Sequence, residues 1–418
     1  MPKNRVLIVG SGSFAQSSVE AFAGAAEFVG VYLSTPPNGI VHWQSSECMV
    51  FDPVNYPDVE RVIQDNEIDL VLPSSLDWIR EIWPRLEKSL EKKCGDKLAV
   101  FAPTGNAMKL ERSRTLSMEC CRKFGIPCPE WHFFENRKEA SRFFNENHGQ
   151  WVIKNPLCSS RAPLQATIYR NRQEAMNATT TLDDSEGIFV QEFVSGPEVG
   201  HFAFVSDGNV QPIATNQEYK YEHDGNLGQP SGAPHGGLVQ ADPEDQYRLS
   251  EQLIKPLTPW FEETNFRGPV QVTAGCHNGR WQVLEYNVRI GVTSGPLFNN
   301  MLMNPLELMV QTANGERPTP KFKPGIEFGV ILSIRGKEGD TIEVDASRPK
   351  GKFWWNQVAR NETGAYQSAG NRVLDVAAFG KKLDSCIEQV YKDSELIKFS
   401  SKSYRKDIGR SMWPPICS

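Results

Sequence analysis

The fold is decided by the stretch Trp281-Gln-Val-Leu-Glu285-Tyr-Asn287-Val-Arg289-Ile-Gly291. Side chains alternate along a β-strand, so Glu285, Asn287 and Arg289 share one face while the residues between them point into a core. Carboxylate and amide oxygens suit Mg²⁺ that also binds substrate phosphates, and an arginine can hold an oxyanion through two hydrogen bonds. A half-exposed strand with ordinary polar residues explains the pattern equally well.

The segment just before this strand shifts the balance toward a metal site. Gly268-Pro-Val-Gln271-Val-Thr-Ala-Gly275 is a second apolar strand, and Asn278-Gly279 is a favoured pair for the tight turn of a hairpin. Gln271 then supplies a third oxygen next to Glu285 and Asn287. The three side chains are candidate ligands of one divalent cation.

Bulk composition bounds the class of protein. The chain has 418 residues, of which 39% are hydrophobic, and 45 Lys and Arg against 51 Asp and Glu give a net charge of -6. This length predicts two to four domains, and the lack of a basic run argues against nucleic acid or a membrane as partner. The first apolar run, 6–9, is too short for a signal peptide, and no stretch approaches the roughly 18 apolar residues of a membrane span.

Cysteine and histidine usage excludes the usual metal centres built from those residues. Nine cysteines form no Cys-x-x-Cys pair, and Cys120 and Cys121 fit a buried helix face, so a reducing cytosol is expected. The seven histidines are scattered without the paired spacing of a zinc site.

The N-terminal part predicts a Rossmann-like domain over residues 1–102. Arg5 to Ala15 is a buried strand entering a G-x-G-x-x-A turn, and a helix and a second strand follow. The later predicted elements are a helix at 58–64, a strand at 68–72, a helix at 78–92 and a strand at 98–101. The turn invites a dinucleotide, but Ser34-Thr-Pro-Pro37 stands where an acidic residue should hold the ribose, so NAD binding is disfavoured.

The rest of the chain predicts α+β lobes with antiparallel sheets. Residues 103–124 are helical in pattern and end at Gly125-Ile-Pro127. The predicted strands are 189–193, 199–205, 210–215, 269–276, 281–288, 329–334 and 373–379, with a helix at 383–391. The glycine- and proline-rich segment 224–237 is expected to be an irregular binding loop. We predict further domains at 103–190, 191–325 and 326–418.

Three more features are candidates for binding a nucleotide. Gln191-Glu-Phe-Val-Ser-Gly-Pro-Glu198 places an acid just past a turn, where it could take the two hydroxyls of a ribose. Lys154 ends the strand 151–154, and Arg114 lies in the helix after Pro103. Each cation alone is more often solvated than functional.

In their order these motifs resemble the ATP-grasp superfamily. The resemblance implies an adenine hinge, cations on the phosphates, three oxygen ligands for Mg²⁺ or Mn²⁺, and Arg289 at the reacting groups with Lys154. The residues assigned to ATP are Arg114, Lys154, Ser159, Ser160, Arg161, Gln191, Glu192, Phe193, Val194 and Glu198. Those assigned to the metal are Gln271, Glu285 and Asn287. Those assigned to the substrates are Gly10, Gly12, Lys220, Ser231, Gly232 and Arg289.

Within that superfamily the whole chain is similar to the glycinamide ribonucleotide synthetase family. The matching segments are Ala102-Pro-Thr-Gly105, Leu110-Glu-Arg-Ser-Arg114, Asn371-Arg-Val-Leu-Asp375 and Tyr404-Arg-Lys-Asp-Ile-Gly409. The resemblance implies a multidomain α/β and α+β protein with a Rossmann-like domain, an ATP-grasp fold and a small closing domain. It implies a cytoplasmic, ATP-dependent ligase, monomeric or homodimeric, that joins a small carboxylate to an amine through an acyl phosphate.

The chain departs from this family where substrates are expected. Phe14-Ala-Gln-Ser17, Ser74-Ser-Leu-Asp77 and Pro230-Ser-Gly-Ala-Pro-His-Gly236 replace family motifs, and Cys158-Ser-Ser-Arg161 replaces glycines over the phosphates. Two alternatives therefore stay open, namely a ligase of other acids and amines, or a nucleotide-binding module without catalysis.

Overall fold

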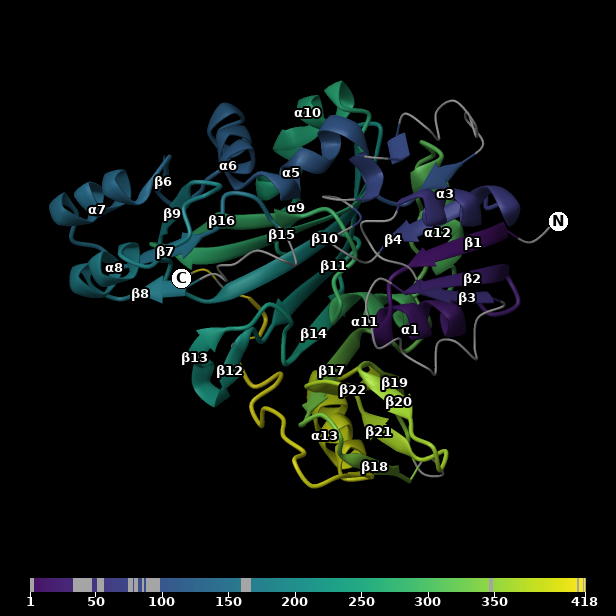
Figure 1. Cartoon of the computed structure of the whole chain (residues 1–418). Coiled ribbons are helices and arrows are strands. Elements are labelled where there is room, and N and C mark those ends of the chain that lie inside the picture. Colours follow the sequence, from purple (N-terminus) through teal and green to yellow (C-terminus); the bar gives the residue numbers. More distant parts are fainter. Residues whose placement is uncertain are drawn as a thin grey trace.

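The computed structural model describes residues 4–32, 47–50, 56–73, 78, 82–84, 86–87, 98–158, 167–345, 349–411, 413–415 and 417. Several sequence predictions lie outside these residues: the end of the second strand at Leu33 to Pro37, the segment Ser74 to Asp77, and the phosphate donors Ser159, Ser160 and Arg161. The molecule has four parts, which meet near the centre of Figure 1.

The N-terminal part is a parallel sheet with helices, as predicted. Its elements are β1 (Asn4–Val9), α1 (Gly12–Phe22), β2 (Ala26–Tyr32), β3 (Glu47–Val50), α3 (Tyr56–Asp65), β4 (Leu70–Pro73) and β5 (Ala99–Val100). The strand order is β3-β2-β1-β4-β5, and the described pairings are parallel. The apolar run at residues 6–9 is fully buried because helices cover both faces of such a sheet.

A small lobe follows, at the left of Figure 1. Its elements are η3 (Gly105–Met108), α5 (Lys109–Arg112), α6 (Arg114–Lys123), β6 (Trp131–Phe134), α7 (Arg137–Glu146), β7 (Trp151–Lys154), β8 (Thr167–Tyr169), α8 (Arg172–Thr179) and β9 (Ile188–Glu192). The strands form an antiparallel sheet in the order β6-β9-β7-β8. Strand β9 crosses the predicted domain boundary at residue 190.

The central part is built around one large antiparallel sheet, with β12 and β13 forming a separate two-stranded sheet. Its elements are β10 (Glu198–Ser206), β11 (Asn209–Glu218), β12 (Tyr221–His223), η4 (Asp224–Asn226), β13 (Leu227–Pro230), β14 (Gly236–Ala241), α9 (Leu249–Leu253), η5 (Lys255–Leu257), α10 (Thr258–Glu263), β15 (Arg267–His277), β16 (Arg280–Asn287), α11 (Ser294–Met301) and α12 (Pro305–Ala313). The strand order is β16-β15-β10-β11-β14-β17-β22-β19, so strands from beyond residue 326 continue this sheet.

The C-terminal elements close the molecule at the bottom of Figure 1. They are β17 (Phe328–Arg335), β18 (Thr341–Val344), β19 (Lys352–Trp355), β20 (Val358–Arg360), β21 (Tyr366–Ser368), β22 (Arg372–Gly380), α13 (Leu383–Ser394) and β23 (Ile397–Lys398). Because β17 pairs with β14, this part is joined to the central sheet by backbone hydrogen bonds as well as by side-chain packing.

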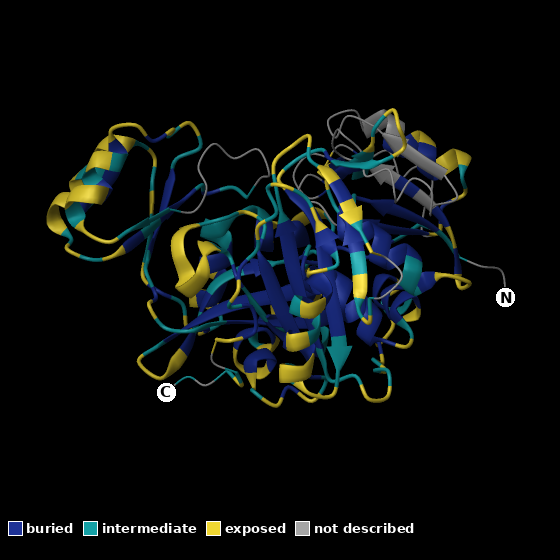
Figure 2. Ribbon diagram, turned by 90° about the horizontal axis from the view of Figure 1, so that it is seen from below, coloured by how far each residue is buried: buried dark blue, intermediate teal, exposed yellow. Residues whose placement is uncertain are grey.

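One apolar core joins the N-terminal part to the central sheet. Phe14 of α1 packs in the same buried cluster as Phe202 and Phe204 of β10 and Phe298 of α11. The buried strands at the centre of Figure 2 are flanked by helices whose outer faces are exposed. The N-terminal part and the central sheet are therefore held together by a shared apolar core.

Two predicted segments differ from the structure. The helical stretch 103–124 breaks at Ser113, whose backbone is extended because it bridges to Leu157, and its Oγ accepts from the Leu116 amide to start α6. The prediction that 224–237 is irregular was wrong for residues 227–230, which form strand β13 paired with β12, and for residues 236–237, which begin strand β14. Gly225 and Gly228 adopt positive φ and let the chain reverse there.

A disulfide joins Cys276 on β15 to Cys417 at the end of the chain. The sequence analysis did not predict it, because 141 residues separate the two cysteines. Cys120, Cys121, Cys128, Cys158 and Cys386 are free thiols.

Gly268 brings the N-terminal part close to β15. Its φ is +146°, and an added Cβ would lie 2.8 Å from Ala102 Cα. We expect Gly268→Ala to lower the free energy of unfolding by about 1–3 kcal/mol, because backbone cannot move aside as a side chain can. Urea denaturation measures this. Gly364→Ala is the control, since φ there is +81° but nothing lies within 4 Å; an equal loss in both variants would contradict the packing argument.

Candidate active site

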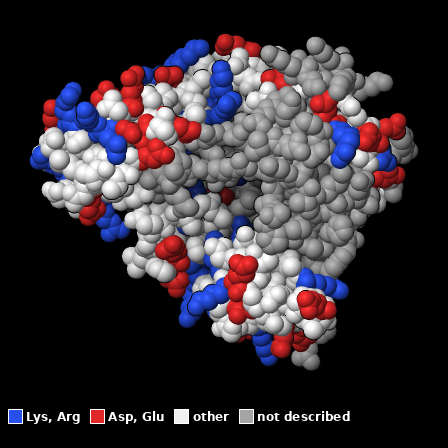
Figure 3. All heavy atoms as spheres, in the orientation of Figure 1, with Lys and Arg blue, Asp and Glu red and all other residues white. Residues whose placement is uncertain are grey.

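A cavity of about 670 Å³ lies where the four parts of the chain meet. In Figure 3, Lys and Arg atoms lie inside the hollow at the middle of the molecule, around an acidic group. Most predicted site residues line this cavity: Gly10, Arg114, Lys154, Gln191, Glu192, Phe193, Val194, Glu198, Lys220, Ser231, Gly232, Gln271, Glu285, Asn287 and Arg289. Gly12 is not among the lining residues.

Three oxygen donors share one face of the β15–β16 hairpin. Gln271 pairs with Asn287, and Thr273 pairs with Glu285, across the two antiparallel strands. Because residues opposite one another point to the same side, the cavity receives all four side chains. A carboxylate and two amide groups on adjacent strands fit the donor preference of Mg²⁺ or Mn²⁺.

Glu285 lies among cations. Its carboxylate accepts from Lys220 Nζ at 3.0 Å and from Arg114 at 3.2 Å. The charge of Lys220 has the largest effect on the pKa of Glu285 and lowers it. Burial, the next largest effect, raises this pKa, but Arg114 and Lys154 lower it again, so the pKa lies well below its usual range. Glu285 is therefore ionised at neutral pH, as a metal ligand must be.

Lys154 is a buried cation at the end of β7. Its Nζ donates to Gln191 Oε1 at 2.8 Å. Burial, and next the charge of Arg114, lower the pKa of Lys154 to about 8. An anionic ligand beside it would reverse this shift, because an opposite charge favours the protonated form.

The helix break at Ser113 determines the position of Arg114. It is the first residue of α6, its amide donates to Pro156 O, and its Nε donates to Asn155 O at 3.1 Å. The guanidinium is thus held next to the loop that follows Lys154, with Glu285 on its other side.

Arg289 is oriented by Glu111, which the sequence analysis did not single out. Glu111 Oε1 accepts from Arg289 Nε at 3.1 Å, and Oε2 accepts from the Val288 amide at 2.7 Å. Burial raises the pKa of Glu111 although Arg289 opposes the shift. The clue that the sequence offered was an acid one turn before Arg114.

The apolar end of the cavity lies beside the segment 191–198. Met118, Leu284 and Val194 line it together with the buried Gln191. At Gly196 an added Cβ would lie 1.9 Å from Cys276 O, so only glycine lets this segment lie on β15. The polar contact seen for the Gln191 side-chain oxygen is with Lys154, and its assignment to a base remains a prediction.

Gly12 begins α1 and is covered by the C-terminal part. Asn356 Oδ1 accepts from the Ser13 amide at 3.0 Å and lies 2.6 Å from the position of an added Gly12 Cβ. The N-terminus of α1, where a phosphate often binds, is occupied by this side chain.

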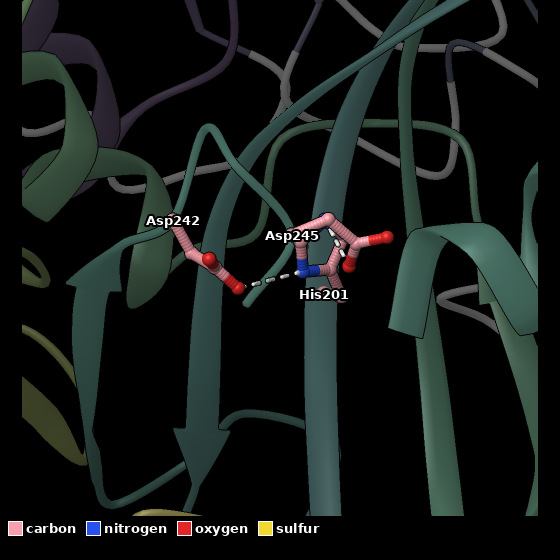
Figure 4. A group of neighbouring side chains, drawn as sticks. All are labelled: His201, Asp242 and Asp245. Atoms are coloured by element: carbon pink, nitrogen blue, oxygen red, sulfur yellow. Dashed lines mark ion pairs between the residues drawn. The ribbon is translucent and has the colours of Figure 1, made fainter. Parts of the chain in front are cut away.

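A separate polar cluster lies on the opposite face of β10 (Figure 4), where His201 approaches Asp242 and Asp245. The Asp242 carboxylate accepts from the Gln246 amide and from Thr215 Oγ1, which also lies 2.9 Å from His201 Nδ1. The Asp245 carboxylate accepts from the amides of Ser250 and Glu251. These bonds fix the turn that leads into α9, so the cluster is explained by the fold.

The two-lobed antiparallel fold and the cavity between its lobes define an ATP-grasp enzyme, a class that uses ATP with Mg²⁺ or Mn²⁺. Residues 112–293 match the model "Phosphoribosylglycinamide synthetase, ATP-grasp (A) domain", and residues 335–411 match "Phosphoribosylglycinamide synthetase, C domain". Together the two matches cover more than half of the chain. The chain belongs to the phosphoribosylglycinamide synthetase family of ATP-dependent ligases that form a C–N bond.

Individual relatives from this family match between about three quarters and nearly all of the chain. Phosphoribosylamine–glycine ligase of Clostridium acetobutylicum is 23% identical, covering 97% of this chain and 100% of the relative. That of Neisseria meningitidis serogroup A is 26% identical over 74% of this chain and 78% of its own length. The crystal structure of the Thermotoga maritima phosphoribosylamine–glycine ligase has a TM-score of 0.77 at 20% identity, covering 97% and 100% of the two chains.

A more distant fold relative is the biotin carboxylase domain of the Hydrogenobacter thermophilus 2-oxoglutarate carboxylase, solved with MgADP. Its TM-score is 0.71 at 13% identity, over 96% of this chain and 91% of that one. In the part of the chain that the structure describes, every helix falls short of the length and apolar character needed to cross a membrane.

We expect Glu111→Gln to lower kcat by about 10- to 100-fold, the range of a lost charge-assisted hydrogen bond, because Arg289 loses its ionic partner. The KM for ATP should stay within about twofold of the wild-type value, since Arg289 lies away from the apolar end of the cavity. Steady-state kinetics measure both, and Glu119→Gln on the exposed face of α6 is the control. A change confined to KM would contradict a role for Glu111 in orienting Arg289.

Lys154 should couple nucleotide binding to proton uptake. Its folded pKa of about 8 lies below the usual value, so the free protein holds the proton below pH 8 and loses it above. ATP favours the charged form, so affinity should fall as pH rises past 8, with a proton taken up on binding. Calorimetry in buffers of different ionisation heat tests this. Lys154→Met should abolish the uptake, and the exposed Lys123→Met should not; equal uptake in both would refute the assignment.

Proposed function

We propose that this chain joins glycine to 5-phosphoribosylamine, with cleavage of ATP to ADP and phosphate, in the cytoplasm. The observation that supports it most is the single hairpin face carrying Gln271, Glu285 and Asn287, next to Arg289, in a chain collinear with phosphoribosylamine–glycine ligases.

The carboxylate substrate is activated first. A carboxylate oxygen attacks the γ-phosphorus of ATP in line, the bond to the β-bridging oxygen breaks, and ADP leaves as the acyl phosphate forms. Lys154 and Arg114 hold the phosphates, and the face of Gln271, Glu285 and Asn287 would hold a divalent cation, which supplies charge neutralisation at the phosphates.

The amine then completes the reaction. Its nitrogen attacks the acyl carbon, phosphate leaves, and the nitrogen loses a proton. Arg289, fixed by Glu111, offers its guanidinium to the oxyanion that develops on the acyl oxygen. The enzyme contributes mainly position and charge, and the residues 231–234 line the cavity, where they would help to exclude the water that hydrolyses the intermediate.

A second candidate keeps the chemistry and changes the substrates. The segment 230–236 departs from the family pattern, and its residues 230–234 line the cavity. A ligase of another amino acid or amine is the alternative that this observation favours.

Substrate-dependent ADP release separates the two candidates. We expect turnover with glycine plus phosphoribosylamine to exceed that of every other pair in a panel of amino acids and amines by at least about tenfold. The preference should appear in kcat/KM, because specificity is set in the transition state. Turnover that does not depend on glycine would contradict the first candidate.

Asn287→Ala tests the metal face independently of the substrates. Loss of one ligand oxygen should lower kcat by about 10-fold or more and raise the Mg²⁺ concentration needed for half activity. Gln282→Ala, on the same strand but outside the cavity lining, is the control. Unchanged ATP turnover in Asn287→Ala would show that the metal lies elsewhere.

A further inference from the structure

A disulfide attaches the C-terminal tail, residues 404–417, to a strand beside the cavity. Cys417 in this tail is joined to Cys276 on β15. In the sheet order β15 lies next to the edge strand β16, whereas the C-terminal part continues the sheet on the other side, from β17. Figures 1 and 2 both place the C-terminus on the small-lobe side of the molecule, opposite the N-terminus. The tail therefore connects two distant parts of the structure.

Cys276 directly supports the segment 191–198, which lies beside the apolar end of the cavity. Its amide donates to Pro197 O at 3.0 Å, and its carbonyl oxygen lies 1.9 Å from the position of an added Gly196 Cβ. Glu198, at the end of the segment, lines the cavity. The disulfide is therefore bonded to the residue against which this segment packs.

The first residues of the tail hold the β12–β13 hairpin. Arg405 is buried, and its guanidinium donates to Tyr221 O at 2.9 Å and to Asn226 Oδ1 at 3.0 Å. The hairpin continues directly into the loop 231–234, which lines the cavity. The tail thus contacts one side of the cavity through this hairpin and the other side through the disulfide.

The end of the tail is held by little apart from the disulfide. Trp413 Nε1 donates to Gln240 Oε1 at 2.9 Å. Beyond it, Pro414, Pro415 and Cys417 make no hydrogen bond to any other described residue. Cys417 also packs against the apolar core that contains Cys276. Breaking the disulfide would therefore leave the chain end attached to β15 by a small apolar contact alone.

This disulfide is placed so that it can be made and broken. In the reducing cytoplasm, where we propose that the enzyme works, disulfides are usually transient and redox-sensing. Cys417 is half-buried, so a reductant can reach its sulfur. Cys120 and Cys386 are buried, and burial raises the pKa of each thiol to about 11, so neither competes as a thiolate near neutral pH.

We propose that the Cys276–Cys417 disulfide is a regulatory site for a dithiol reductant, and that its reduction weakens ATP binding. A thiolate of the reductant attacks Cys417 Sγ, the bond between the two sulfurs breaks, and Cys276 leaves as a thiolate that takes up a proton. The second thiol of the reductant then attacks its own sulfur in the mixed disulfide and releases Cys417. The protein gains two electrons and two protons, and the reductant becomes a disulfide.

Reduction weakens ATP binding because it removes a restraint between the two sides of the cavity. With the disulfide present, the tail limits the separation of the segment 191–198 and the hairpin that leads into the loop 231–234. Without it, more of the ordering of these segments must accompany nucleotide binding, which lowers the affinity. The coupling is reciprocal, so bound ATP must favour the disulfide over the two thiols by the same factor.

Calorimetric titration of the full-length protein with a non-hydrolysable ATP analogue and Mg²⁺ tests the proposal. We expect the protein reduced with dithiothreitol to bind the analogue at least about fivefold more weakly than the protein oxidised with glutathione disulfide, the lower end of usual coupling between sites. Reoxidation should restore the affinity. Circular dichroism confirms that both forms are folded at the temperature used, and mass mapping after alkylation confirms the pairing. Equal affinity of the two forms would overturn the proposal.

Serine variants identify the thiols. Cys417→Ser should bind the analogue as weakly as the reduced wild type and should not respond to dithiothreitol. Cys128→Ser is the matched control, because Cys128 is also half-buried and packs against the same apolar core. It should keep the wild-type response. An affinity of Cys417→Ser equal to that of the oxidised wild type, or loss of the response in Cys128→Ser, contradicts the assignment.

The reciprocal effect distinguishes regulation from a purely structural disulfide. In a glutathione buffer of fixed composition, saturating ATP analogue and Mg²⁺ should raise the ratio of disulfide to dithiol protein by the factor that separates the two affinities. An unchanged ratio would mean that the disulfide only stabilises the fold. Because ATP binding alone is measured, these tests do not depend on the substrates, and a failure of glycine and phosphoribosylamine to release ADP leaves them unaffected.

Discussion

The site depends on one buried carboxylate held between cations. Glu285 contacts Lys220 and Arg114, which come from different parts of the chain, and the field of these cations keeps it ionised inside the cavity. An isolated buried carboxylate would instead take up a proton. With the charge kept, the β15–β16 face can bind a divalent cation, and the same cations can hold phosphates. Metal and nucleotide binding thus share one electrostatic arrangement.

The N-terminal, central and C-terminal parts of the chain are joined so that this arrangement is maintained. A common apolar core links α1 to the central sheet, and β17 continues that sheet into the C-terminal part. The C-terminal part therefore both closes α1, through Asn356, and presents Arg372 to the cavity.

Strand alternation accounts for what the sequence could predict. Period-two patterning places Glu285, Asn287 and Arg289 on one face, and the hairpin turn brings Gln271 beside them. The Rossmann-like sheet and the antiparallel lobes follow from the same local patterns. What the pattern cannot predict is contact between distant segments: Glu111 with Arg289, Ser113 with Leu157, Asn356 with Ser13, and Cys276 with Cys417. Those contacts decide which candidate residues line the cavity and which do not.

The most direct test of the central claim is Mn²⁺ binding to the protein–ATP analogue complex, followed by electron paramagnetic resonance, in the wild type and in Glu285→Gln. If Glu285 is an ionised metal ligand, the wild type binds Mn²⁺ tightly in the complex and Glu285→Gln binds it at least about tenfold more weakly. Equal Mn²⁺ affinity in the two proteins would contradict the account, because the hairpin face would then not hold the metal.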